Sequence, residues 1–212
     1  MGLLRAGINF ELKSRMDSGS VLFIHGLFMP SWIMLPLAHR LNRNGFHCFG
    51  YDYPTRIRRV GQHGAELAAI LSRFSEPRFD VVTHSMGGLI LRSALSQAPG
   101  LVRRIGRVVM IAPPNRGSDL AFDWLNRLSF ADRIVVPLPD LSSGADSPVH
   151  ALPVPEMELG ILAAENDHAV RLPQTRIGVE RDHLVLPGAH TDILFRRETA
   201  VRIERFLRTG TF

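Results

Sequence analysis

The sequence predicts an α/β fold: a three-layer α/β/α sandwich around a mostly parallel central sheet of about six strands. Two observations carry this prediction. Short apolar runs alternate along the chain with longer amphipathic patterns of helical period, and the runs are apolar throughout instead of alternating with polar residues. Strands of this kind are buried on both faces, as in parallel sheets that carry helices on each side.

The length of the chain limits the number of domains. With 212 residues, of which 45% are hydrophobic, the chain can bury one sizeable core and little more. We therefore predict a single domain over residues 1–212. Residues 1–18 are a possible tail. Residues 118–155 are a possible short insertion, because the stretch from 134 to 155 is rich in Pro, Ser and Gly and has no clear period.

Six segments are predicted as strands, and turn signals separate them. The first is 21–25 (VLFIH), and the second is 47–53 (HCFGYDY), which follows a helical pattern that ends near Asn44–Gly45. The others are 79–83 (FDVVT), 107–112 (RVVMIA), 159–164 (LGILAA) and 184–186.

Helices are predicted between these strands from apolar residues spaced three and four apart. The clearest examples are Leu67, Ile70, Leu71 and Phe74; Leu91, Ala94, Leu95 and Ala98; and Ile203, Phe206 and Leu207. Residues 118 to about 128 could form another. Right-handed crossovers then bring the carboxyl ends of the strands to one edge of the sheet, where the loops should carry the chemistry.

The charge of the chain does not indicate a nucleic-acid partner. The net charge is +5, but Arg is spread along the whole sequence and Lys13 is the only lysine. No binding motif accompanies the charge, so a solvated basic surface is the simpler interpretation. The sequence indicates no oligomeric state.

The compartment predicted for this chain is cytoplasmic. Cys48 is the only cysteine, so no intrachain disulfide can form, and its apolar surroundings favour a small buried residue over a nucleophile. The first 20 residues lack an apolar run typical of a secretory signal, and no stretch approaches the ~18 apolar residues that a spanning helix needs. Stable membrane insertion is therefore not expected.

The best candidate nucleophile is Ser85, in the segment 83–88 (THSMGG). The segment follows a predicted strand and opens a predicted helix, so the serine would sit on a sharp bend at a helix N-terminus. Gly87 and Gly88 supply the small residues that such a bend requires. A serine that merely caps the helix is the alternative, but capping explains neither the glycines nor the His25-Gly26-Leu27 segment after an earlier strand.

These two segments together resemble the α/β-hydrolase family, in particular its small bacterial lipase-like and esterase-like branch with a minimal cap. Thr83 stands where the family usually has the first glycine of G-x-S-x-G. The resemblance implies an oxyanion hole made by the main-chain N–H groups of Met86 and Leu27, with Phe28 as the alternative donor. It gives His25 a structural role. It also makes residues 118–155 a possible short lid.

The chain order of this fold, nucleophile then acid then histidine, directs the choice of base and acid. His190 follows the last predicted strand, whereas His183 precedes it, so His190 is the better candidate base. Asp167 follows the strand 159–164 and resembles the acid of the family; Glu165 is its nearest rival, and Asp119 occupies a position that the family sometimes uses.

The resemblance implies a serine hydrolase that cleaves a carboxylic ester through an acyl-enzyme. An acyltransferase or thioesterase on the same triad, or a non-catalytic binding protein, are the alternatives. Phe28, Met29 and Trp32 could line an acyl pocket, although ordinary core packing would also explain them. The expected partner is a small ester or lipid-like molecule. No nucleotide-binding motif and no histidine cluster with metal-ligand spacing is present, so no cofactor or metal is predicted.

Overall fold

The computed structural model describes residues 7–16, 18–154 and 156–212. Within them, seven strands form one sheet in the order β1-β3-β2-β4-β5-β6-β7. The strands are β1 (Ile8–Leu12), β2 (Ser20–Ile24), β3 (His47–Tyr51), β4 (Phe79–His84), β5 (Ile105–Ile111), β6 (Leu159–Ala164) and β7 (Asp182–Leu186). All neighbouring pairs are parallel except β1 with β3. The predicted α/β sandwich with a mostly parallel sheet is confirmed.

Strand β1 is the difference from the prediction, which places these residues in a possible tail and counts six strands. β1 pairs antiparallel with β3 at the edge of the sheet, and its residues alternate between buried and exposed. Phe10 lies over Gly50, where an added Cβ would come within 2.0 Å of the ring. A short alternating edge strand gives a weaker sequence signal than a fully buried one. Residues 1–6 and 17 of that possible tail lie outside the described residues.

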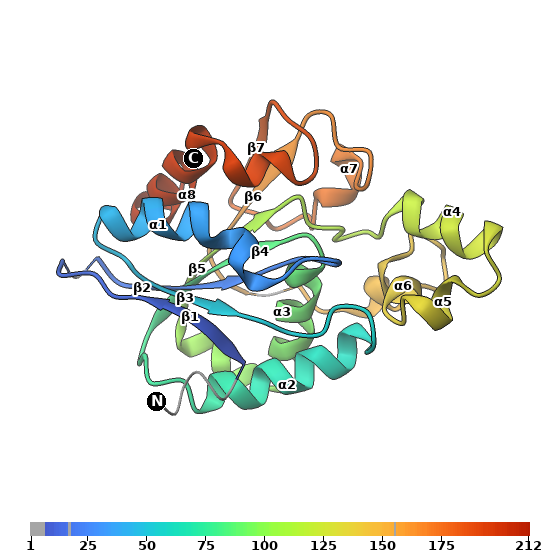
Figure 1. The fold of residues 1–212 in the computed structure, drawn as a ribbon, viewed down its shortest axis with the longest axis horizontal. Coiled ribbons are helices and arrows are strands. Elements are labelled where there is room, and N and C mark those ends of the chain that lie inside the picture. The colour runs from blue at the N-terminus through green and yellow to red at the C-terminus, as the bar shows by residue number, and fades with distance from the viewer. Residues whose placement is uncertain (1–6, 17, 155) are drawn as a thin grey trace.

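Helices cover both faces of the sheet (Figure 1). α1 (Leu35–Arg43) and α8 (Arg197–Thr209) pack on one face, and α2 (Val60–Ser72) and α3 (Met86–Gln97) pack on the other. Successive side chains of a strand point to opposite faces, so Val81 of β4 contacts the α2–α3 layer and Val82 the α1–α8 layer. This double burial explains why the strands are apolar throughout.

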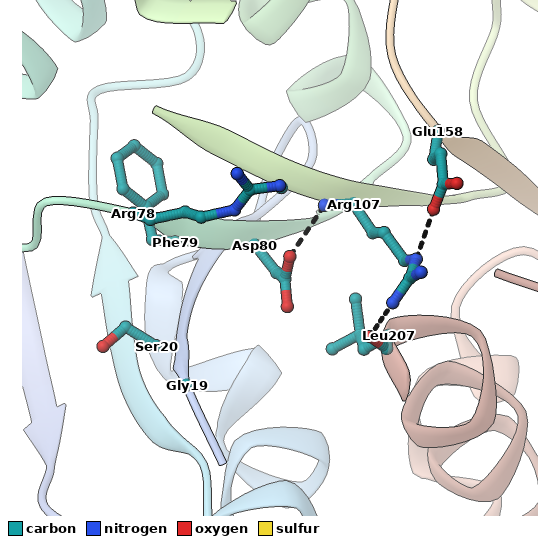
Figure 2. Close-up of a pocket in the computed structure, with 9 residues that line it drawn as sticks. Gly19, Ser20, Arg78, Phe79, Asp80, Arg107, Glu158 and Leu207 are labelled. Atoms are coloured by element: carbon teal, nitrogen blue, oxygen red, sulfur yellow. Dashed lines mark hydrogen bonds and ion pairs between the residues drawn. The ribbon is translucent and has the colours of Figure 1, made fainter. Parts of the chain in front are cut away.

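A polar pocket of about 460 Å³ lies at the amino ends of β2, β4 and β5 (Figure 2). There the main-chain N–H of Arg107 donates to Asp80 (2.7 Å), and its guanidinium donates to Glu158 and to the carbonyl of Leu207 (2.8 Å). Hydrogen bonding to Arg107 lowers the pKa of Glu158, and burial raises the pKa of Asp80. Arg107 and Glu158 form an ion pair, and the pocket lies at the edge opposite to that where parallel sheets place their sites.

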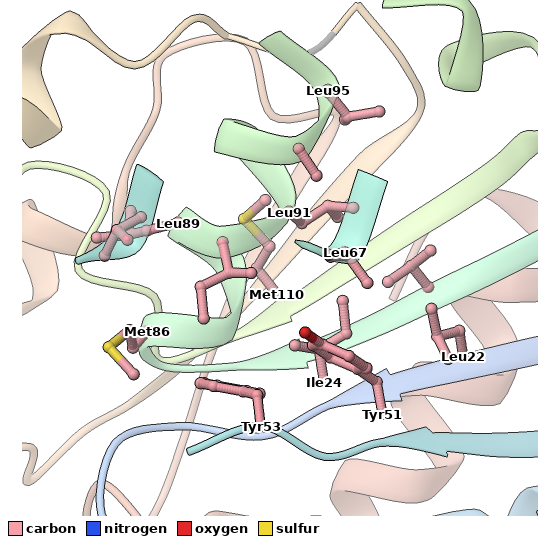
Figure 3. Packing of buried hydrophobic residues seen from close by; sticks show 14 of the residues in the cluster. Leu22, Ile24, Tyr51, Tyr53, Leu67, Met86, Leu89, Leu91, Leu95 and Met110 are labelled. Carbon is pink, nitrogen blue, oxygen red and sulfur yellow. The ribbon is translucent and has the colours of Figure 1, made fainter. Parts of the chain in front are cut away.

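The larger apolar layer fills the space between the sheet and the helices α2 and α3 (Figure 3). Leu22 and Ile24 of β2 meet Leu67 of α2 and Leu91 of α3, and all four are 0% exposed. Full burial of such side chains contributes about 1.5–3 kcal/mol each. The layer holds α3, and with it the start of that helix, rigidly against the sheet.

Cys48 lies in the other apolar layer, under α1 and α8. Burial raises the pKa of its thiol to about 12, so the side chain stays un-ionised at neutral pH. The prediction of a small buried residue is confirmed.

Residues 118–154 form a lobe of short helices beside the carboxyl ends of the strands (Figure 1). The lobe contains α4 (Asp119–Arg127), α5 (Ala131–Ile134), α6 (Leu138–Leu141) and η4 (Pro148–Ala151). The buried carboxylate of Asp140 ties it to the main body, because it accepts two hydrogen bonds from Arg59 (2.6 and 2.9 Å) and one from the N–H of Val60 (2.8 Å). The remaining short helices are η2 (Ser31–Met34), η3 (Pro99–Arg103), α7 (Leu172–Thr175) and η5 (Asp192–Phe195).

Candidate active site

Ser85 occupies a strained bend between β4 and α3. Its backbone has φ 50° and ψ −125°, in a region that non-glycine residues rarely adopt. The bend is possible because α3 approaches the end of β2 very closely at Gly87, where an added Cβ would lie 2.5 Å from the carbonyl oxygen of Ile24. The serine side chain is thereby lifted onto the carboxyl edge of the sheet, as the sequence predicts.

The same bend accommodates Thr83, the residue that departs from the family pattern. Its hydroxyl lies 3.3 Å from the position that a Cβ on Gly88 would take. Because Gly88 has no side chain, the larger threonine fits without moving the helix.

The imidazole of His190 lies between Ser85 and Asp167. Its Nε2 is 2.9 Å from the Ser85 hydroxyl, and its Nδ1 is 2.7 Å from Oδ2 of Asp167. A carboxylate only accepts hydrogen bonds, so Nδ1 carries the proton and Nε2 presents its lone pair to the serine hydroxyl. The three residues named from the sequence are therefore brought together in the order that proton transfer from the serine requires.

Asp167 is fixed by its own loop. Its Oδ1 accepts hydrogen bonds from the main-chain N–H groups of Ala169 (2.8 Å) and Val170 (2.9 Å), and its side chain is 2% exposed. The carboxylate therefore has one oxygen held by the main chain and the other free to orient the imidazole.

The rival residues have other partners or positions. Nε2 of His183 lies 2.9 Å from the hydroxyl of Thr175, and Asp119 forms an ion pair with Arg171 at 3.1 Å. Glu165 is exposed to solvent. None of these three lines the cavity that contains Ser85.

Met86, one of the two donors predicted for an oxyanion hole, directly follows Ser85, and Leu27, the other, lines the same cavity as Ser85. Met86 is the first residue of α3, where an N–H has no partner within the helix. The N–H of Phe28, the alternative donor, is used by the hydroxyl of Thr55 (3.1 Å), which leaves Leu27 as the better candidate. Neither Leu27 nor Met86 has an acceptor for its N–H among the residues that the structure describes.

The loop that carries Leu27 is held by the segment after β3. The hydroxyl of Tyr53 donates to the carbonyl of His25 (2.6 Å), and the carboxylate of Asp52 accepts from the N–H of Ser31 (2.6 Å). The ring of His25 is buried and stacks on Tyr53 at 4.3 Å. Burial lowers the pKa of His25, so it is neutral at neutral pH. The ring of His25 therefore supports the loop that carries Leu27 and does not line the cavity beside Ser85.

An apolar cavity of about 170 Å³ opens beside Ser85. It is lined by residues of the main body and of the lobe: Leu27, Phe28, Met29, His84, Ser85, Pro114, Ser118, Leu120, Ala121, Trp124, Leu138, Leu141, Ala169, Val170 and His190. No Asp, Glu, Lys or Arg side chain is among them. The cavity suits an uncharged, apolar group.

Phe28 and Met29 line this cavity as predicted, but Trp32 does not. Trp32 lies on the short helix η2, which begins directly after Pro30, and 59% of its surface is exposed. Sequence reasoning also missed Leu138 and Leu141 of α6, which lie in a stretch without helical period. The only sequence signal that could have identified them as lining residues is their apolar character within a Pro-rich segment.

The structure closely resembles lipases and esterases of the α/β-hydrolase fold, which confirms the resemblance predicted from the sequence. A lipase of Bacillus licheniformis in its mature form superposes with a TM-score of 0.75 at 18% identity, over 96% of this chain and 98% of that one. An esterase of Thermogutta terrifontis gives 0.67 at 12% identity, over 96% and 93%. A monoacylglycerol lipase of Paleococcus ferrophilus gives 0.69 at 14% identity, over 95% and 98%. At these identities the likeness establishes the fold.

Residues 8–136 match the family model described as a domain of unknown function, DUF7379, and the chain belongs to that family. The comparison with curated protein sequences gives no match. Among the described residues, no helix has the length and apolarity to cross a membrane, and no group of three or more His, Cys, Asp or Glu side chains is arranged to hold a metal ion.

Proposed function

We propose that the protein is a serine hydrolase that cleaves carboxylic esters through an acyl-enzyme on Ser85. The observation that carries the proposal is the continuous chain of contacts from the Ser85 hydroxyl through His190 to Asp167, at 2.9 and 2.7 Å. A serine hydroxyl is a weak nucleophile at neutral pH, and an adjacent oriented imidazole is the usual means of activating it. The lipases and esterases of the same fold support the choice of an ester as substrate.

In the acylation step, Oγ of Ser85 attacks the ester carbonyl carbon while Nε2 of His190 takes the hydroxyl proton. The carbonyl oxygen becomes an oxyanion, which the N–H groups of Leu27 and Met86 stabilise; loss of one such donor typically costs about 3 kcal/mol of barrier. The C–O bond to the alcohol then breaks, and His190 returns its proton to the departing oxygen. Asp167 stabilises the imidazolium and holds its ring in place.

In the deacylation step, a water molecule takes the place of the alcohol. His190 accepts a proton from the water, whose oxygen attacks the acyl carbon, and the same two N–H groups stabilise the second oxyanion. Collapse releases the carboxylic acid and restores the Ser85 hydroxyl. An alcohol or thiol could enter in the same way, so acyl transfer uses the same residues.

The cavity favours an uncharged acyl group of short or medium length. Its lining is apolar on all sides except at Ser85, the two histidines and Ser118. Helices α4 and α6 supply part of that lining, which supports a lid-like role for residues 118–155. A charged acyl chain would lose its hydration there without gaining a partner.

Hydrolysis of p-nitrophenyl esters by purified variants tests the proposal. Ser85→Ala and His190→Ala should each lower kcat by at least about 10³-fold, and the double variant should be no worse than either, because the residues act as a unit. Asp167→Asn should retain more activity than either. His183→Ala is the matched control, because this second histidine of the same segment lies outside the cavity, and it should keep the wild-type rate.

Retention of the wild-type rate by Ser85→Ala, or equal losses in His183→Ala and His190→Ala, would contradict the proposal. Product analysis with and without an added alcohol separates hydrolysis from acyl transfer: free acid alone indicates a hydrolase, and a new ester as the main product indicates a transferase.

A further inference from the structure

His84, the residue directly before the nucleophile, is a buried histidine that the proposed mechanism does not use. It ends β4, its side chain is 0% exposed, and its ring borders the cavity beside Ser85. A buried imidazole carries two polar nitrogens that need an explanation, because burial of an unpaired polar group costs free energy.

One nitrogen of the ring contacts the residue proposed as the base. Nε2 of His84 lies 2.9 Å from the main-chain carbonyl oxygen of His190, and the two rings are 4.9 Å apart at 51°. A carbonyl only accepts, so Nε2 of His84 carries the proton and donates it. The hydrogen bond holds the main chain of His190 close to the strand that carries the nucleophile.

The other nitrogen faces the loop that carries Leu27. Nδ1 of His84 is buried and has no hydrogen-bond partner among the described residues. A Cβ added to Gly26 would lie 2.9 Å from this nitrogen and 3.0 Å from Cβ of Ser85. The ring therefore packs directly against Gly26, and it is the absence of a side chain there that allows the loop to approach both residues.

The charge state of His84 suits this position. Burial, and to a smaller extent the neighbouring His190 ring, lower the pKa of His84 to about 3, against the opposing effects of the hydrogen bond to the His190 carbonyl and of Asp167. The ring is therefore neutral at neutral pH and does not repel the positive charge that His190 acquires during the proposed reaction.

We propose that His84 is a positioning residue that holds His190 at hydrogen-bond distance from Ser85. This inference rests on the proposed function. One residue thereby links three parts of the site: its main chain joins the nucleophile, its ring donates a hydrogen bond to the base, and the same ring packs against the loop that carries Leu27. A displacement of about 1 Å in a catalytic group can cost about 10²-fold in rate, so loss of this hydrogen bond should lower kcat while leaving KM almost unchanged.

The test compares substitutions that keep or remove the donor. His84→Phe keeps a ring of similar size without a donor, and His84→Gln places an amide N–H near the position of Nε2, whereas the shorter side chain in His84→Asn does not reach it. We expect kcat to fall about 10- to 100-fold in His84→Phe and His84→Asn, with KM within about 2-fold of wild type, and to recover largely in His84→Gln. Val82→Ala, on the same face of β4 two residues earlier, is the control for loosened packing and should keep kcat.

Circular dichroism and thermal unfolding establish which variants fold. If His84→Phe does not fold, the comparison of His84→Gln with His84→Asn decides alone. Wild-type kcat in His84→Phe or His84→Asn, or equal losses in His84→Gln and His84→Asn, would overturn the positioning role while leaving the ester hydrolase intact. A wild-type protein that neither cleaves esters nor reacts with a fluorophosphonate at Ser85 would reject both proposals.

Discussion

Three non-glycine residues adopt positive φ angles among the described part of the chain, and all three lie where strands end at the site. Phe28 (φ 61°) follows β2, Ser85 (φ 50°) follows β4 and Ala112 (φ 47°) follows β5. Each such conformation costs about 1–3 kcal/mol and persists only where the surrounding structure imposes it. Here the packed strands and α3 impose these angles, and the result is a hydroxyl and two N–H groups held at one edge of the sheet.

His84 predicts a specific pH dependence of stability. Its pKa in the folded protein is about 3, against an ordinary value of 6.5, so below pH 6.5 the unfolded chain binds a proton that the folded chain does not. The contribution of His84 to the free energy of unfolding is therefore fully present above pH 6.5, and it is lost as the pH falls from 6.5 toward 3. Between pH 7 and 4.5 the wild type should lose roughly 2–3 kcal/mol more than His84→Gln, whose side chain does not titrate.

Urea denaturation of both proteins at the two pH values measures this difference. The other buried histidines titrate equally in the two proteins and cancel. An equal loss of unfolding free energy in wild type and His84→Gln would show that the ring is not shielded from protons in the folded state.

At the scale of elements, the bend between β4 and α3 depends on how closely the helix approaches β2. Gly87 leaves no room for a side chain, since an added Cβ would meet the carbonyl oxygens of Ile24 and His25 at 2.5 and 2.7 Å. These are main-chain atoms of a central strand and its loop, so they can move only if the loop that carries Leu27 moves too.

Gly87→Ala should therefore destabilise the protein by about 2–4 kcal/mol and lower kcat together with stability. Gly61→Ala is the matched control, because Gly61 also lies near the start of a helix, α2, but an added Cβ there would meet nothing within 4 Å. That substitution should stabilise the protein by up to about 1 kcal/mol. Thermal unfolding and ester hydrolysis of both variants check the pair, and equal effects at the two positions would contradict the close approach.

Most of the elements could be predicted because central parallel strands are apolar on both faces. The six predicted strands all exist, and the placement of His190 after β7 and Asp167 after β6 followed from their order. Strand β1 was not predicted because only one of its faces is covered. The part of the cavity lining that α6 supplies was not predicted either. Leu138 and Leu141 belong to a four-residue helix, which is too short to show a helical period in the sequence. Trp32 lies only four residues after Phe28 but does not line the cavity, because closeness in sequence does not determine the direction of a side chain after a turn.

At the scale of the whole molecule, the cavity arises where the lobe of residues 118–154 meets the carboxyl edge of the sheet. Leu141 of α6 closes one side of it, while Ser85 and His190 lie on the main body. The size of the acyl group that fits should therefore depend on the lobe, and the chemistry on the sheet.

Leu141→Ala should shift the preferred acyl chain of p-nitrophenyl esters toward greater length, because it enlarges the cavity without touching the triad. Leu101→Ala is the control: Leu101 is buried to the same extent, 6% exposed, in the same apolar layer, but it does not line the cavity. Both should lose about 2–5 kcal/mol of stability, and only Leu141→Ala should change the order of kcat/KM values across acetate, butyrate, hexanoate and octanoate. If both variants gave the same order of kcat/KM values, the acyl chain would bind outside this cavity.

The most direct measurement of the central claim is covalent labelling by a fluorophosphonate, read by intact mass and peptide mapping. We expect one label per chain, attached to Ser85, with labelling strongly slowed in His190→Ala and unchanged in His183→Ala. A label on another residue, or equal labelling rates in wild type and His190→Ala, would contradict the claim that the imidazole of His190 activates this serine.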